Sequence, residues 1–169
     1  MRIRYFLISG LLASAAIYAA SPKSDASADG PAAWARLKTL AGEWEADTPE
    51  GKAHLNLELI AGGTALVERE TAEKMPAMET VYHLDGGRLL LTHYCMEGNQ
   101  PRMEASSFNG EKGELQFRFL DATNLKPGAE HMHDVLFHFV DKDHFESAWQ
   151  LYENGKPKFT EKALYTRVR

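Results

Sequence analysis

Two pairs of residues in this sequence have the types and the spacing of a metal or cofactor site. His93 and Cys95 are separated by one residue, and so are His131 and His133. In an extended strand, residues at i and i+2 point to the same side, so each pair places two ligand atoms next to each other. Imidazole and thiolate are good ligands for zinc, copper and haem iron. The two pairs therefore form a candidate site for a transition metal or a haem.

Polar residues near these pairs extend the candidate site. Gln100 follows the first pair in a predicted loop and is not explained by turn geometry. Asp121 ends a predicted strand, where its carboxylate would orient a histidine through the second ring nitrogen. Asn99 and Asn124 are explained by turn formation. The predicted ligand-binding residues are His93, Cys95, Gln100, Asp121, His131 and His133.

Simpler interpretations of the same residues stay open. A histidine in a strand is often a hydrogen-bonded wall residue, and a lone cysteine often packs as a small apolar side chain.

The sequence contains no glycine-rich phosphate loop, no G-x-S-x-G string and no H-E-x-x-H string. Glu68 and Glu70 alternate with Val67 and Arg69, so we assign them to an outer surface and expect no pair of carboxylates on an inward face.

The elements that must position these residues change in type at Gly42. Residues 31–40 are predicted to form a helix, because Trp34, Leu37 and Leu40 would lie on one buried stripe. Beyond Gly42 apolar and polar residues alternate in short segments separated by turn residues such as Asp85-Gly86-Gly87. The ten predicted strands are residues 43–47, 53–60, 64–71, 78–84, 88–96, 102–108, 114–121, 130–140, 144–152 and 158–168.

Ten short strands joined by tight turns predict an all-β fold, an antiparallel up-and-down barrel of about ten strands preceded by one short helix. Closure is expected because it removes exposed sheet edges. Consecutive strands run in opposite directions, which brings both candidate pairs to the rim opposite Trp44. His131 and His133 share a face with Val135, so we expect them to point inward and to converge with His93 and Cys95.

The beginning of the predicted barrel resembles a known group. Gly42-Glu43-Trp44 after a short helix resembles the G-x-W opening of the lipocalin-like (calycin) barrels. The resemblance implies that Trp44 plugs the closed end and that Arg167 or Arg169, in the last strand, covers it. The domain is also similar to a set of uncharacterised exported bacterial proteins that share the strings H-Y-C at 93–95, G-N-Q-P at 98–101 and H-M-H at 131–133. These resemblances imply a barrel with a cavity and do not give a ligand.

The first residues have the layout of a secretory signal peptide. Arg2 and Arg4 precede an apolar stretch over residues 5–20, and small residues follow. This stretch is shorter than the roughly 20 residues that a bilayer span needs. We therefore predict a signal peptide over residues 1–20, a flexible leader over 21–30 and one barrel domain over 31–169. The mature chain is expected to be exported, either periplasmic or secreted, with no stable membrane span after cleavage.

The distribution of charge argues against nucleic acid and anionic membranes as partners, and the cysteine count excludes an intramolecular disulfide. Loss of Arg2 and Arg4 with the signal peptide changes the formal net charge from −5 to −7. The remaining basic residues are scattered, whereas nucleic acid and anionic membrane surfaces require clustered Lys and Arg. Cys95 is the only cysteine, so no intramolecular disulfide is possible.

The sequence thus favours an exported barrel that binds a small, partly apolar molecule at the open rim opposite Trp44. One alternative is a metal- or haem-binding barrel that uses the two pairs. A further alternative is a hydrolase or isomerase with a rim histidine as general base. A structural barrel with a filled interior is the fourth possibility. A binding protein is favoured over an enzyme, and the sequence does not indicate the oligomeric state.

Overall fold

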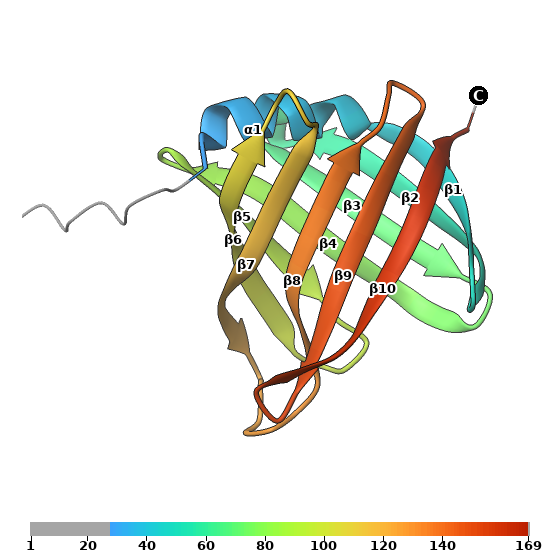
Figure 1. The fold of residues 1–169 in the computed structure, drawn as a ribbon, viewed down its shortest axis with the longest axis vertical. Helices are drawn as coiled ribbons and strands as arrows, with labels where there is room; N and C mark the ends of the chain where they lie inside the picture. The colour runs from blue at the N-terminus through green and yellow to red at the C-terminus, as the bar shows by residue number, and fades with distance from the viewer. Residues whose placement is uncertain (1–27, 169) are drawn as a thin grey trace, which may run out of the picture.

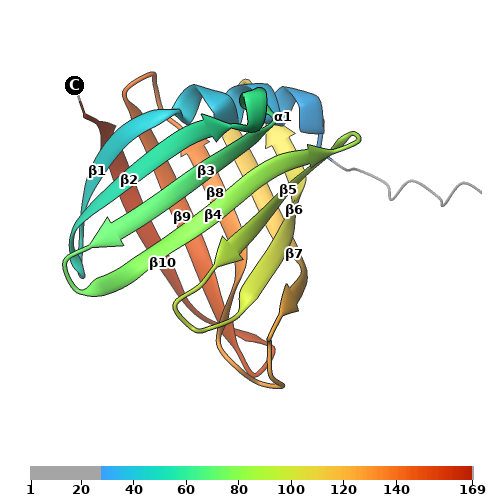
Figure 2. The same ribbon diagram turned by 180° about the vertical axis from the view of Figure 1, so that it is seen from behind.

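The computed structural model describes residues 28–168, which form a closed ten-stranded antiparallel barrel preceded by one short helix (Figures 1 and 2). The predicted signal peptide and residues 21–27 of the predicted leader lie outside the described residues. The helix α1 (Gly30–Leu37) continues as a 3-10 turn, η1 (Lys38–Leu40). The strands are β1 (Gly42–Thr48), β2 (Gly51–Ile60), β3 (Ala65–Ala72), β4 (Met75–Asp85), β5 (Arg88–Tyr94), β6 (Gln100–Asn109), β7 (Glu114–Thr123), β8 (His131–Phe139), β9 (His144–Glu153) and β10 (Lys156–Arg167). A second 3-10 turn, η2 (Ala61–Gly63), connects β2 to β3.

The strands follow one another around the barrel in chain order, and β1 pairs with β10 to close it. The predicted fold class is therefore confirmed. Odd-numbered strands run away from α1 and even-numbered strands run towards it (Figure 1). The connections β1–β2, β3–β4, β5–β6, β7–β8 and β9–β10 consequently meet at the end opposite α1. We call this the open end.

Helix α1 covers the other end of the barrel, against β4, β5 and β6 (Figure 2). Its N-terminus is capped by Asp29, whose side chain accepts a hydrogen bond from the backbone N–H of Ala32 at 3.0 Å. The helix begins at Gly30, one residue before the predicted start, and a Cβ there would lie 2.1 Å from the backbone oxygen of Gly87. Close packing on the β4–β5 turn thus requires glycine. Within residues 28–168, no helix is long and apolar enough to cross a lipid bilayer.

Trp44 and Arg167 fasten this closed end. The Trp44 indole N–H donates to the backbone oxygen of Leu40 at 2.7 Å, and the Arg167 guanidinium lies 4.0 Å above the indole ring. Arg167 also donates to the backbone oxygens of Ala41 and Thr39, each at 2.9 Å. The expectation that an arginine of the last strand covers Trp44 is confirmed for Arg167.

Gly42 is required by this contact. Its φ of +129° lies in a region that residues with a side chain rarely adopt. A Cβ at this position would also lie 2.8 Å from an Arg167 guanidinium nitrogen. Both observations explain why the first strand begins with glycine.

Three pairs of neighbouring strands are hydrogen-bonded over only part of their length. β1 pairs with β10 at only two positions, Trp44 with Arg167 and Glu45 with Thr166, both near α1. β7 and β8 pair only over the first five residues of β7. β5 and β6 pair over three residues of each strand. The barrel is therefore tightly closed beneath α1 and splayed at the opposite end.

We predict that Arg167→Met destabilises the protein by about 2–3 kcal/mol, because three charge-assisted hydrogen bonds and one cation–π contact are lost. The matched control is Arg69→Met on the outer face of β3, where the arginine makes an exposed ion pair with Glu79. That change should cost less than about 1 kcal/mol. Urea denaturation measures both, and equal losses would contradict the role assigned to Arg167.

Candidate functional site

His131 and His133 do not converge on the barrel interior. The pairing of β8 with β9 shifts by one residue between Met132 and Asp134, so His133 has no partner on β9. Met132 pairs with the core residue Leu151, and His131 lies on the opposite face of the strand. A one-residue irregularity reverses the alternation of side chains beyond it. The prediction that both histidines point inward with Val135 is therefore wrong.

The two histidines instead fill the split between β7 and β8. The His133 ring stacks on Tyr152 with ring centroids 3.9 Å apart, and on Phe119 at 4.9 Å. His131 contacts the Phe119 ring at 5.0 Å, and its Nδ1 lies 3.1 Å from the backbone oxygen of Ala129. These contacts are those of packed side chains at the margin of the barrel.

His93 does lie inside the barrel. It is 4% exposed, and its ring lies 5.0 Å from the half-buried ring of Trp149. Nδ1 is 2.9 Å from the Thr80 hydroxyl, whereas Nε2 is buried and has no hydrogen-bond partner among the described residues. Burial lowers the pKa of His93 to about 4, so the imidazole is neutral at physiological pH.

Cys95 lies in the connection between β5 and β6, and Gln100 is the first residue of β6. Cys95 is buried, and burial raises the pKa of its thiol. Its backbone N–H donates to the backbone oxygen of Asn99, whose own side chain donates to the backbone oxygen of Glu130 at 2.8 Å. The Gln100 side-chain oxygen accepts from the Asn124 side chain at 3.1 Å. Gln100 and Asn99 thus tie this loop to the β7–β8 loop.

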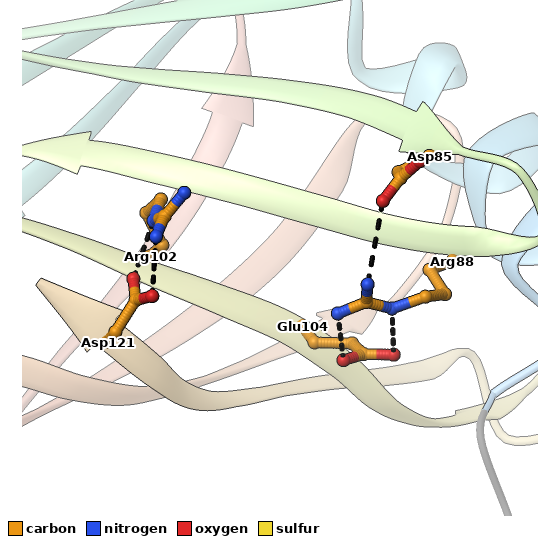
Figure 3. Close-up of polar contacts among 5 residues, drawn as sticks. All are labelled: Asp85, Arg88, Arg102, Glu104 and Asp121. Atoms are coloured by element: carbon orange, nitrogen blue, oxygen red, sulfur yellow. Dashed lines mark hydrogen bonds and ion pairs between the residues drawn. The ribbon is translucent and has the colours of Figure 1, made fainter. Parts of the chain in front are cut away.

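Asp121 does not orient a histidine. Figure 3 shows its carboxylate paired with both ends of the Arg102 guanidinium, between β6 and β7. Both side chains are about half exposed. The same sheet carries a second ionic group of three residues, in which Arg88 bridges Glu104 and Asp85 (Figure 3). The predicted supporting role of Asp121 is therefore wrong, because the cross-strand arginine takes up its carboxylate.

The predicted metal or haem site is not formed by the two pairs. His93 lines the lumen and His131 and His133 pack elsewhere, so the expected convergence is absent. Within residues 28–168, no group of three or more His, Cys, Asp or Glu side chains is arranged to hold a metal ion. The space beside His93 has a volume of about 10 Å³, which does not fit a haem.

Two carboxylates that the sequence analysis placed on the outer surface lie in the lumen. In the β2–β3 hairpin, Glu68 is opposite Leu57 and Glu70 is opposite Leu55, and both leucines are core residues. Glu68 is 4% exposed. The assignment of Glu68 and Glu70 to an outer surface is wrong, because the hairpin register gives them the inward face of β3. The signal was available: Leu55 and Leu57 are inward by their alternation, and pairing across the Gly62-Gly63 turn carries that face to β3.

Tyrosine hydroxyls hold both carboxylates. Tyr82 donates to Glu68 at 3.0 Å, and Tyr165 donates to Glu70 at 3.2 Å. Burial raises the pKa of Glu68 to about 8, and the nearby charge of Glu70 adds to this effect. Burial also raises the pKa of Glu70 to about 7, with a further contribution from the charge of Glu161. Both acids are therefore ready to carry a proton near neutral pH.

Two adjacent hollows occupy the open end. The inner chamber, of about 10 Å³, has room for about one water molecule, and Glu70, His93, Trp149, Glu161 and Tyr165 are among the residues that line it. The outer cavity has a volume of about 680 Å³ and is lined by residues of the β1–β2, β3–β4 and β5–β6 connections, β8, β9 and β10. Met78, Met132 and Glu161 line both hollows. These three side chains therefore separate the chamber from the cavity.

Comparison with solved structures supports the fold and nothing finer. The chain is similar to Rv2717c from M. tuberculosis, with a TM-score of 0.54 and 16% sequence identity over 81% of this chain and 98% of that chain. It also matches a protein of unknown function of the DUF3598 family from Nostoc punctiforme, with a TM-score of 0.27 and 8% identity over 80% of this chain and 98% of that one. No protein-family model matches the chain, and the comparison with curated proteins gave no match.

We predict that Glu70→Gln changes how stability depends on pH. The pKa of about 7 in the folded protein exceeds the ordinary value of 4.5, so the folded state binds this proton more tightly than the unfolded chain does. The stability contributed by Glu70 is thus complete below the ordinary pKa and is lost as the pH rises through about 7. Glutamine cannot ionise, so at about pH 8 the variant should be more stable than the wild type by up to about 3 kcal/mol.

Urea denaturation of both proteins at about pH 5 and about pH 8 checks this prediction. The lowered pKa of His93 acts in the opposite direction, but it is common to both proteins and cancels in the difference. Glu58→Gln, on the exposed face of β2, is the control and should leave the pH profile unchanged. An unchanged profile in Glu70→Gln would show that Glu70 is not buried as a carboxyl.

Proposed function

We propose that this protein is an exported binding protein or carrier that holds a small, partly apolar molecule in the lumen at the open end. The observation that carries the proposal is the outer cavity of about 680 Å³, which adjoins the inner chamber through Met78, Met132 and Glu161. Ligand sites for small molecules commonly occupy about 300–1,000 Å³ and lie at the mouths of barrels. The predicted signal peptide supports a periplasmic or secreted location, and the lipocalin-like resemblance supports a carrier.

The walls of the outer cavity suit an apolar molecule. Met75, Met96, Met132, Leu151 and Phe159 contribute side chains to it. Methionine is unbranched and polarisable, so it adapts to ligands of different shape. A cavity lined by four methionines, Met75, Met78, Met96 and Met132, therefore favours a flexible apolar body over a single rigid one.

The mouth of this cavity follows from the way the barrel closes. β10 pairs with β1 only near α1, and residues from both sides of the resulting gap line the cavity: Glu50 after β1, and Phe159 and Glu161 on β10. A ligand that enters here places its apolar part between these strands and its far end towards the inner chamber. Within that chamber it meets His93, whose Nε2 lacks a partner.

Binding is favoured over catalysis by the state of the histidines. The pKa of His93, about 4, makes it a weak base at neutral pH, where a general base works best with a pKa near 7. His131 and His133 are held by ring packing at the β7–β8 split. The hypothesis of a hydrolase or isomerase with a rim histidine as general base therefore has no support from their geometry.

We predict that the uncharged probe N-phenyl-1-naphthylamine binds with an increase in its fluorescence, and that Met132→Trp weakens this binding at least about tenfold by filling the part of the outer cavity next to the inner chamber. Met75→Trp, nearer the mouth, should act in the same direction and serves if the first variant folds poorly. Leu136→Trp is the control, because Leu136 lies on the outer face of β8 and is exposed.

Thermal unfolding of each variant separates a loss of fold from a loss of binding. Wild-type protein that leaves the probe fluorescence unchanged would contradict the proposed function. So would equal binding by the wild type and by well-folded Met132→Trp and Met75→Trp.

A further inference from the structure

Three carboxylates gather where the two hollows meet. Glu70 and Glu161 line the inner chamber, and Glu161 and Glu50 line the outer cavity. Glu70 lies on β3 and Tyr165 on β10, and these strands are separated by β1 and β2 in the barrel order. The hydrogen bond from Tyr165 to Glu70 therefore crosses the lumen and brings β3 and β10 together there. Glu161 precedes Tyr165 by four residues, on the same face of β10 and nearer the open end.

No cationic side chain neutralises this group within residues 28–168. Neither Lys nor Arg lines the inner chamber, and none of the ion pairs in this part of the chain includes Glu50, Glu70 or Glu161. Lys74 and Lys162 line the outer cavity, but both are exposed. Burial raises the pKa of Glu161, and the charge of Glu50 adds to this effect. Burial also raises the pKa of Glu70, with further contributions from the charges of Glu161 and Glu50. Buried like charges need either protons or a bound cation.

A second observation points to a ligand at the same place. His93 is 4% exposed and lines the inner chamber with Glu70 and Glu161, and its buried Nε2 has no hydrogen-bond partner among the described residues. One oxygen of Glu50 is also buried without a partner. With the ring proton on Nδ1, facing the Thr80 hydroxyl, Nε2 is a hydrogen-bond acceptor. In this tautomer, Nε2 in the chamber and the Glu50 oxygen beside the outer cavity are both unpartnered acceptors, and they require a donor.

We infer that the polar end of the ligand is a primary ammonium group, seated between Glu70 and Glu161 with one N–H directed to His93 Nε2, while its apolar chain fills the outer cavity. This inference rests on the proposed function. An ammonium group supplies three donors and one positive charge. It is close in size to the single water molecule for which the chamber has room. The rings of Trp149 and Tyr165, which line the chamber, add a cation–π contribution.

The same geometry disfavours two related ligands. A fatty acid would bring a further negative charge beside three carboxylates that have no cationic partner. A quaternary ammonium has the right charge, but it cannot donate to His93 Nε2 and its methyl groups exceed the chamber. The ligand class is thus a primary amine with an apolar chain.

Competition against N-phenyl-1-naphthylamine at neutral pH tests this inference, with four compounds of equal chain length: decylamine, decan-1-ol, decanoate and decyltrimethylammonium. Decylamine should bind at least about tenfold more tightly than decan-1-ol, and decanoate more weakly than either. Decyltrimethylammonium should lose most of the advantage of decylamine. In Glu161→Gln the preference for decylamine over decan-1-ol should fall to within about threefold, while the affinity for decan-1-ol is unchanged.

Glu58→Gln, on the exposed face of β2, should keep the full preference, and Glu50→Gln is the second test variant if Glu161→Gln folds poorly. Equal affinities for decylamine and decan-1-ol in the wild type would overturn the amine assignment and leave the proposed function standing, since both compounds displace the probe. An undiminished preference in well-folded Glu161→Gln and Glu50→Gln would also overturn it. Failure of the probe itself to bind would overturn the proposed function together with this inference.

Discussion

Arg167 holds the last strand of the barrel to the first. Its guanidinium lies above the Trp44 ring and donates to the backbone oxygens of Thr39 and Ala41, so one side chain joins η1, β1 and β10. β1 and β10 have only two paired positions, and this contact adds to them. Because it lies at the α1 end, the strands are fixed there and separate at the other end. The outer cavity occupies the space that this separation leaves.

The interior changes in character along the barrel axis. Beneath α1, the rings of Trp44, Phe145 and Phe137 pack edge to face or at a tilt and fill the lumen. Further along, Tyr82 and Tyr165 present hydroxyls to Glu68 and Glu70, and each hydrogen bond offsets part of the cost of burying a carboxylate. At the open end, His93 Nε2 and one oxygen of Glu50 are buried without a hydrogen-bond partner among the described residues. A ligand that supplies donors and positive charge would complete this polar region.

Much of the fold was predictable from local patterns, whereas the site was only partly so. The G-x-W string placed Trp44, and the alternation of β5 placed His93 in the wall, because both depend on a single strand. His131 and His133 were misplaced because a register shift between Met132 and Asp134 leaves no mark in the alternation of apolar residues. Alternation within β3 alone does not show which face Glu68 and Glu70 take; the register with β2, fixed by the turn between the two strands, puts them on the inward face. Long-range contacts, such as the hydrogen bond from Tyr165 to Glu70, depend on closure of the barrel and cannot be predicted from either strand alone.

The most direct test of the central claim, that the lumen at the open end is the ligand site, is a crystal structure of the protein with decylamine. The account predicts density for the ammonium group between Glu70 and Glu161, within hydrogen-bond distance of His93 Nε2. The alkyl chain should lie along Met132 towards Met75, between β1 and β10. Density confined to the outer surface, for example along the exposed Leu136 and Leu164, with an empty lumen, would contradict the account.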